Sequence, residues 1–174
     1  MQFTHDWLPQ RVRFAPGGAA EAIVEEVRRL GAARVMAIAS DATRAEPVLA
    51  GVPVVVLHTD VVMHVPVEVA QRARAVADEH RADALVCVGG GSTTGLAKAV
   101  ALTTGLPIVA VPTTYAGSEQ TTIYGLTGGE HKQTGKDPAV LPRVVVYDPE
   151  LTLGLPPGVT GPSAFNALAH SVEA

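Results

Sequence analysis

The sequence contains little cysteine, no excess of basic charge and no long apolar run. Cys87 is the one cysteine among 174 residues, so no disulfide can form within the chain, as suits a reducing cytoplasm. The formal net charge of −4 gives no reason to expect nucleic acid or an anionic membrane as a partner. No apolar stretch is long enough to span a bilayer, and Met1–Trp7 lacks the layout of a signal peptide. We therefore expect a cytoplasmic protein.

What the sequence does contain is an apolar content of 47%, typical of a folded globular domain, and one glycine-rich turn. Leu85–Val88 is a short apolar run that favours a buried strand, in which Cys87 packs in the core. Residues 89–91 are all glycine, which allows a sharp turn and lets a ligand approach the backbone closely. A hydroxyl at 92–94 can cap the next helix and leave first-turn N–H groups for an anion. A plain strand-to-helix connection is the alternative, but one glycine would suffice for it.

This turn matches neither of the two common phosphate-binding fingerprints. Thr94 stands where G-x-G-x-x-G requires its last glycine. Lys98 follows Gly95 by three residues instead of one, so the P-loop pattern fails as well. Lys98 itself is expected either to contact a ligand or to be solvated. The local pattern thus predicts a phosphate cradle without naming the cofactor.

Strand-like and helical patterns alternate along most of the chain. The expected strands are Arg11–Phe14, Arg34–Ala39, Pro53–Leu57, Leu85–Val88, Pro107–Val111 and Val144–Tyr147. The expected helices include Ala20–Leu30, Pro66–His80 and the segment between the glycine turn and Gly105. This order predicts an α/β fold with a parallel sheet flanked by helices, whose ligands bind at the carboxyl edge of the strands. The pattern weakens over 121–143, which suggests loops or a short antiparallel excursion.

Two further segments fall on the predicted ligand edge. Asp41 follows a strand, where it can bind a ribose hydroxyl or, equally, cap the next helix. The segment 112–119 offers hydroxyls and a glycine that can hold phosphates or a nicotinamide, or can simply form a capped loop. His131 and Lys132 lie in the weakly patterned region, where a mobile surface loop is the default expectation.

The C-terminal segment carries a possible ligand pair. Residues 153–162 are expected to form a linker, and a helix is expected to begin at Ser163. This helix shows no stop signal before Ala174, which suggests a fragment of a longer protein. Asn166 and His170 are four residues apart and share one helix face. An Asp–His pair at this spacing could bind a divalent metal, but Asn is a weak neutral ligand, so a structural role for His170 remains open.

Taken in order, these motifs resemble the iron-containing alcohol dehydrogenase superfamily and, within it, the maleylacetate reductases. The resemblance rests on residues 89–96, 112–119, 141–143 and 165–170, together with Asp148-Pro149, and extends over almost the whole chain. It implies a Rossmann-like dinucleotide-binding domain of the dehydroquinate synthase-like fold over residues 1–160. Residues 161–174 would then be the first helix of a helical C-terminal domain that is otherwise absent from this sequence.

The resemblance also implies NADH or NADPH as cofactor, bound between the two domains. Asp41 would lie near the adenosine ribose; its charge disfavours NADPH, whereas Arg44 could accommodate the extra phosphate, so the choice stays open. The pyrophosphate would lie at Gly89, Gly90, Gly91 and Ser92. The path to the nicotinamide would be lined by Thr113, Thr114, Tyr115 and Ser118, with Leu126 and Lys132 nearby.

Two departures from the family pattern bear on the chemistry. Metal-dependent relatives have Asp in place of Gly95 and Asn166, which implies that no metal is bound here. His170 and Asn166 would then be catalytic groups that face the substrate. The implied reaction is reduction of maleylacetate to 3-oxoadipate, in the breakdown of aromatic compounds, by a homodimer. A metal-dependent alcohol or polyol dehydrogenase and a non-catalytic nucleotide-binding module are the alternatives, and the isolated fragment is expected to be inactive.

Overall fold

A six-stranded parallel sheet forms the centre of the molecule, in a computed structural model that describes residues 8–128 and 131–173. The strand order is β1-β8-β5-β4-β2-β3. The bounds are β1 (Arg11–Phe14), β2 (Val35–Ile38), β3 (Val54–His58), β4 (Ala84–Gly89), β5 (Ile108–Pro112) and β8 (Val144–Tyr147). The expected α/β class and the six expected strands are confirmed, with small shifts at their ends.

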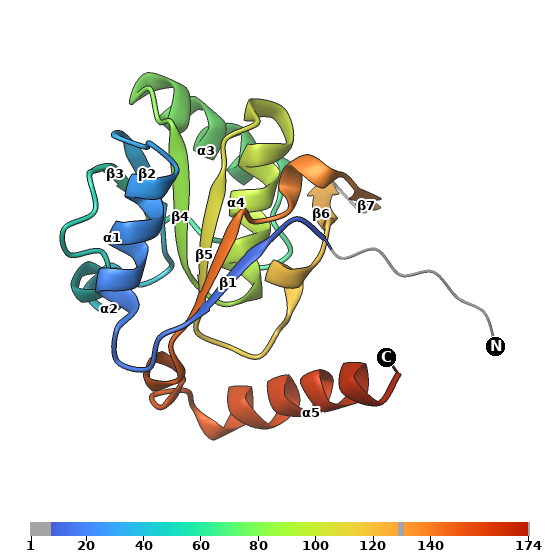
Figure 1. Ribbon diagram of the computed structural model, residues 1–174. Coiled ribbons are helices and arrows are strands. Elements are labelled where there is room, and N and C mark those ends of the chain that lie inside the picture. Colours follow the sequence, from blue (N-terminus) through green and yellow to red (C-terminus); the bar gives the residue numbers. More distant parts are fainter. Residues whose placement is uncertain (1–7, 129–130, 174) are drawn as a thin grey trace, which may run out of the picture.

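Helices cover both faces of the sheet (Figure 1). The helices are α1 (Ala19–Arg29), α2 (Ala42–Val48), α3 (Val67–Glu79) and α4 (Gly91–Thr104). Because neighbouring strand residues point to opposite faces, Leu85 and Cys87 of β4 pack with α3 and α4. Val86 and Val88 pack on the other face, with α1 and α2. Both faces are apolar, as expected for a parallel sheet that is covered on each side.

The strand order reverses next to β2. The chain passes from β2 to β3 on one side, and β4 then pairs with the opposite side of β2. All strands of this sheet are parallel, so the carboxyl ends of β2 and β4 lie at the same edge and flank the reversal. Open α/β sheets bind ligands at this point. Residues 40–41 and the glycine turn 89–91 therefore stand where the sequence places a ligand.

A separate antiparallel hairpin follows β5. Of the two expectations for residues 121–143, loops or a short antiparallel excursion, it agrees with the second. It consists of β6 (Ile123–Gly128) and β7 (His131–Lys136), preceded by η1 (Ser118–Gln120) and followed by η2 (Pro138–Val140). His131 and Lys132 lie in β7, so the expected mobile loop is wrong for their backbone. Their side chains are outside the described part of the structure.

Asp148 and Gly105 fix two helix ends, the start of α1 and the end of α4. Asp148, just after β8, accepts hydrogen bonds from the N–H groups of Gly17 and Ala19 at the start of α1. Its Oδ1 also accepts from the Glu150 N–H at the start of η3 (Pro149–Thr152). Gly105 ends α4 in the left-handed region, with φ of 69°, as its sequence position predicts.

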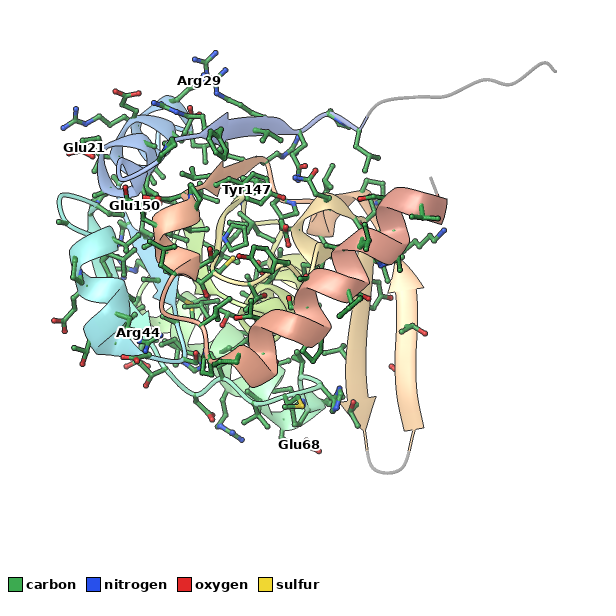
Figure 2. All side chains as sticks on the ribbon, turned by 90° about the horizontal axis from the view of Figure 1, so that it is seen from below. Glu21, Arg29, Arg44, Glu68, Tyr147 and Glu150 are labelled. Carbon is green, nitrogen blue, oxygen red and sulfur yellow. The ribbon has the colours of Figure 1, made fainter. Side chains whose placement is uncertain are left out.

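Helix α5 (Pro157–Glu173) begins six residues before the expected start at Ser163, and residues 157–162 are helical instead of a linker. Prolines in the first turn cost no hydrogen bond, and the Pro156 carbonyl accepts from the N–H of Thr160, which closes that turn. Pro162 gives up only one later bond. The helix passes below the carboxyl edge of the sheet and crosses the front of the view in Figure 2. No helix within the described residues is long and apolar enough to cross a membrane.

Candidate functional site: a cleft at the carboxyl edge of the sheet

A cleft of about 1070 Å³ opens between the carboxyl edge of the sheet, the β6–β7 hairpin and α5. Its walls come from segments that are distant in the sequence. They are the start of α4, the loop 115–121 after β5, the turn 63–65 after β3, the β6–β7 hairpin, Tyr147 of β8 and the last turns of α5. The cleft therefore exists only in the folded chain.

The glycine turn forms one wall, through Gly91 and Ser92. Helix α4 begins at Gly91 with Gly90 as its N-cap residue, and no side chain caps it. The expected cap by a hydroxyl at 92–94 is wrong, because these residues already belong to the first turns. Thr93 and Thr94 point inward and are each 2% exposed. The N-terminal N–H groups of α4 are thus left without a side-chain cap, as an anion-binding helix start requires.

The glycines also allow two loops to approach each other closely. The Thr113 N–H donates to the Gly89 carbonyl at 3.0 Å. A Cβ on Gly90 would lie 3.0 Å from Cγ2 of Thr114, and one on Gly91 would lie 3.4 Å from the Cβ of Ala116. Part of the glycine requirement is therefore structural, since the loop after β5 packs directly on the turn.

Lys98 is neither solvated nor free to contact a ligand, contrary to both expectations. Its side chain is 1% exposed and its Nζ lies on the inner side of the loop 118–123. Nζ donates to the carbonyl oxygens of Ser118 at 2.6 Å, Thr121 at 2.7 Å and Ile123 at 2.8 Å. The Thr121 hydroxyl lies 3.1 Å away as a fourth oxygen. Lys98 therefore fixes the shape of the loop that forms the floor of the cleft.

Burial and the charge of a neighbouring group shift the pKa of Lys98 in opposite directions. Desolvation lowers its pKa to about 8, while the nearby Glu119 carboxylate raises it. The oxygens around Nζ favour the ammonium form, so the side chain is charged at neutral pH. A buried cation therefore lies directly under the cleft.

Glu119 connects this loop to the sheet. Its carboxylate is 4% exposed and accepts a hydrogen bond from the Tyr147 hydroxyl at 2.8 Å. Gln120 donates to the same hydroxyl at 2.8 Å. Burial, together with the Glu119 charge, raises the pKa of Tyr147 well above its ordinary range. Tyr147 thus stays protonated and lines the cleft as a neutral polar group (Figure 2).

Only some of the residues predicted to line the path to the nicotinamide lie at the cleft. Tyr115 and Ser118 line the cleft, whereas Thr113 and Thr114 lie behind them against the glycine turn. The Ser118 Oγ is buried and has no hydrogen-bond partner among the described residues. The Tyr115 N–H donates to Oγ of Ser163 at 2.8 Å, which attaches α5 to this loop. Buried hydroxyls without partners suit a ligand that carries amide or phosphate groups.

Three other predicted positions lie away from the cleft or outside the described side chains. Asp41 caps α2, with Oδ1 accepting from the Arg44 N–H at 3.2 Å, so the capping alternative is realised. Leu126 is 7% exposed and packs in the core of α3 and α4, so it does not line the cleft. The Lys132 side chain is outside the described residues. Gly125 and Tyr124 of β6 line the cleft instead.

Asn166 and His170, the predicted pair on α5, lie in different surroundings. His170 lines the cleft together with Ala167 and Ser171. Asn166 is exposed on the same helix and is not part of the lining. Sequence reasoning missed the turn 63–65, Tyr124 and the role of Lys98. The one signal for Lys98 was a lysine within an otherwise apolar helix, whereas the turn 63–65 gave none.

Comparison with known proteins agrees with this geometry. The sequence model of the iron-containing alcohol dehydrogenase family matches residues 9–149. The chain belongs to that family.

Relatives in the family share this half of the molecule. The maleylacetate reductase of Pseudomonas sp. (strain P51) is 49% identical over 99% of this chain and 50% of its own length. An iron-containing alcohol dehydrogenase from Corynebacterium glutamicum superposes with a TM-score of 0.96 at 53% identity, over 99% of this chain and 49% of that one. A sulfoacetaldehyde reductase from Bifidobacterium kashiwanohense, solved with NAD⁺, gives 0.90 at 27% identity, over 99% and 53%. The chain thus spans about half the length of its relatives.

The name of the family raises the question of iron. The structurally described residues include no group of three or more His, Cys, Asp or Glu side chains that could hold a metal ion. His170 and the neutral Asn166 amide do not form such a set. The donors that the structure describes do not fit iron by themselves, although the family name gives no support to the expectation that no metal is bound. The uncapped start of α4 and the unpartnered Ser118 hydroxyl, by contrast, fit a dinucleotide.

Proposed function

We propose that the full-length protein is an NADH- or NADPH-dependent reductase that converts maleylacetate to 3-oxoadipate, and that this chain is its cofactor-binding half. The observation that carries the proposal is 49% identity to a maleylacetate reductase across nearly the whole chain, glycine turn and cleft included. The proposal includes a cofactor-binding domain over about residues 1–160 and a second domain from residue 161 onward. Helix α5 begins close to this boundary, at Pro157. Cytoplasmic location and a homodimer are parts of it as well.

The residues would act mainly by binding and orientation. The N–H groups at the start of α4 receive the pyrophosphate, since a helix N-terminus favours negative charge. Ser118 and Tyr115 line the path to the nicotinamide, and Asp41 stands at the carboxyl end of β2 for the ribose. The bound cofactor supplies a hydride, as its own chemistry dictates.

The substrate side of the cleft has to stabilise negative charge. Hydride addition to a carbon–carbon double bond conjugated with a ketone produces an enolate, which then takes up a proton. The buried Lys98 ammonium lies beneath the cleft, and a preorganised positive charge of this kind stabilises a developing oxyanion through its electrostatic field. His170 faces the same space and can donate a hydrogen bond.

The test is an NADH oxidation assay with the purified full-length protein and maleylacetate. We expect maleylacetate-dependent loss of NADH absorbance, with NADPH compared in parallel. We also expect turnover to survive treatment with a chelator, since Asn166 supplies no charged ligand. Turnover of simple alcohols that depends on added iron or zinc would instead support a metal-dependent dehydrogenase. Residues 1–174 alone are expected to be inactive, because the cofactor cleft would lack its second domain.

A further inference from the structure

The cleft is lined by side chains that can carry positive charge and by no carboxylate among the described residues, which the proposed dianionic substrate would explain. Among the described residues that line it, none is aspartate or glutamate. The side chains that can carry positive charge are His64, Lys98 and His170. Glu119 is the nearest buried acid, but its carboxylate is engaged by the Tyr147 hydroxyl and lies behind it. Such a lining favours an anionic ligand.

Lys98 cannot pair directly with that ligand. An ammonium has three N–H donors, and Nζ is already surrounded by four oxygens of the loop 118–123. Its burial leaves no free donor that faces the cleft. Lys98 therefore acts on a ligand only through the electrostatic field of its charge. A direct contact between an anion and a side chain that can carry positive charge requires His64 or His170 in this half of the cleft.

His64 is held by a backbone conformation that needs an explanation. It has φ of 64°, and the next residue, Val65, has φ of 46°. Both are in the left-handed region, which is rare for non-glycine residues and an outlier for a β-branched side chain. A turn that only joined β3 to α3 could use glycine here without strain. Strained backbone in a folded protein is concentrated at binding and catalytic sites.

Three contacts with β6 and α4 fix the backbone of this turn. The Thr127 hydroxyl donates to the His64 carbonyl at 2.9 Å, and the Thr127 N–H donates to the Val65 carbonyl at 3.1 Å. The Val65 side chain is 4% exposed and lies against Gly95 of α4, where a Cβ would be only 3.1 Å from its Cγ2. Gly95 thus lets the turn sit close to α4. The exposed His64 side chain is left facing the cleft.

We propose that His64 binds a carboxylate of the dianionic substrate by donating a hydrogen bond from its imidazole ring, and that it is a specificity-determining residue of this site. The inference rests on the proposed function, because that function supplies a substrate with two carboxylates. His64 comes from a different element than His170 on α5, so the two can hold separate parts of one ligand. In the proposed function the pyrophosphate would be bound at a third element, the start of α4.

The test uses full-length protein with three variants. His64→Asn removes the imidazole and keeps a residue that tolerates the left-handed region. His64→Arg places a cationic donor at the same position. His80→Asn changes a histidine at the end of α3, outside the cleft lining, and serves as the matched control. We expect His64→Asn to raise KM for maleylacetate by about 10-fold or more, the effect of losing one charge-assisted hydrogen bond. His64→Arg should restore most of the affinity, and the Kd for NADH and the Tm should not change.

The result that overturns the inference is an unchanged KM in His64→Asn, or a loss that His64→Arg fails to reduce. If the wild type does not turn over maleylacetate, the proposed function fails, and binding then decides the inference separately. Succinate, a dianion, and its neutral diamide are titrated into the protein–NADH complex, with NADH fluorescence as the readout. The inference stands if succinate binds better than the diamide and His64→Asn removes the difference. It falls if wild-type protein makes no distinction.

Discussion

Replacing Lys98 by methionine keeps most of the side-chain length but removes the ammonium from beneath the cleft. Three carbonyl oxygens, of Ser118, Thr121 and Ile123, then lose a buried donor. Each unsatisfied buried acceptor costs about 1–3 kcal/mol, and relief of the desolvation of the ammonium offsets part of the sum. We expect Lys98→Met to lower the free energy of unfolding by about 2–4 kcal/mol at neutral pH.

The same variant predicts a pH dependence with a definite sign. Burial lowers the pKa of Lys98 from 10.5 to about 8, so above pH 8 the folded protein binds fewer protons than the unfolded chain. The folded state is therefore stabilised as the pH rises from about 7 to about 9.5. The carbonyl oxygens oppose the fall in pKa, so we expect a gain of only about 1–2 kcal/mol relative to Lys98→Met. Using the variant as reference cancels the contribution of titrating groups that do not interact with Lys98.

The assay is urea unfolding of the full-length protein and of Lys98→Met at several pH values, with NADH affinity measured alongside. Lys136→Met removes an exposed lysine from β7 and is the matched control. It should change the free energy of unfolding by less than about 0.5 kcal/mol. A loss below about 1 kcal/mol for Lys98→Met, or a gap from wild type that does not widen with pH, would refute the reasoning about the buried ammonium.

Two further substitutions test how the site is positioned. Gly89→Ala should cost about 3 kcal/mol and weaken NADH binding, because the new Cβ would lie 2.4 Å from Oγ1 of buried Thr93. Gly158→Ala, which meets nothing within 4 Å, is its control, and equal urea midpoints for the two variants would contradict this account. Asp148→Ala should cost about 2 kcal/mol, since the carboxylate accepts from Gly17 and Ala19 at the start of α1. Thermal unfolding measures it, and a Tm equal to that of the wild type would show that the cap contributes nothing.

Much of the fold could be predicted from local patterns. Buried valine-rich runs such as Val144–Tyr147 are too short for helices, and the expected strands agree with the structure to within one or two residues. Gly105 ends α4 because it adopts the left-handed region without a Cβ penalty. The start of α5 could not be predicted in the same way. Glycines and prolines over 153–162 favour a linker, yet prolines near a helix start cost little and the helix forms from Pro157.

Less of the candidate site could be predicted, since its walls come from separate elements. The glycine turn and the loop 112–119 were recognisable from their own residues as candidates for the ligand edge, and both contribute residues to the cleft. Leu126 was expected near the cofactor, but the hairpin turns its side chain into the core. His64 gave no signal, because its left-handed backbone depends on Thr127, which is 63 residues away in the sequence.

The sequence by itself determined the strand–helix alternation, the parallel sheet and the position of the glycine turn at the carboxyl edge of the strands. These features depend on side-chain periodicity and on the steric freedom of residues that are neighbours in the chain. Only the tertiary structure decided what surrounds Lys98 and His64. Whether a lysine is solvated or buried under three carbonyls depends on which distant segments pack on it. That packing is set by the burial of the whole core and leaves no local pattern in the chain.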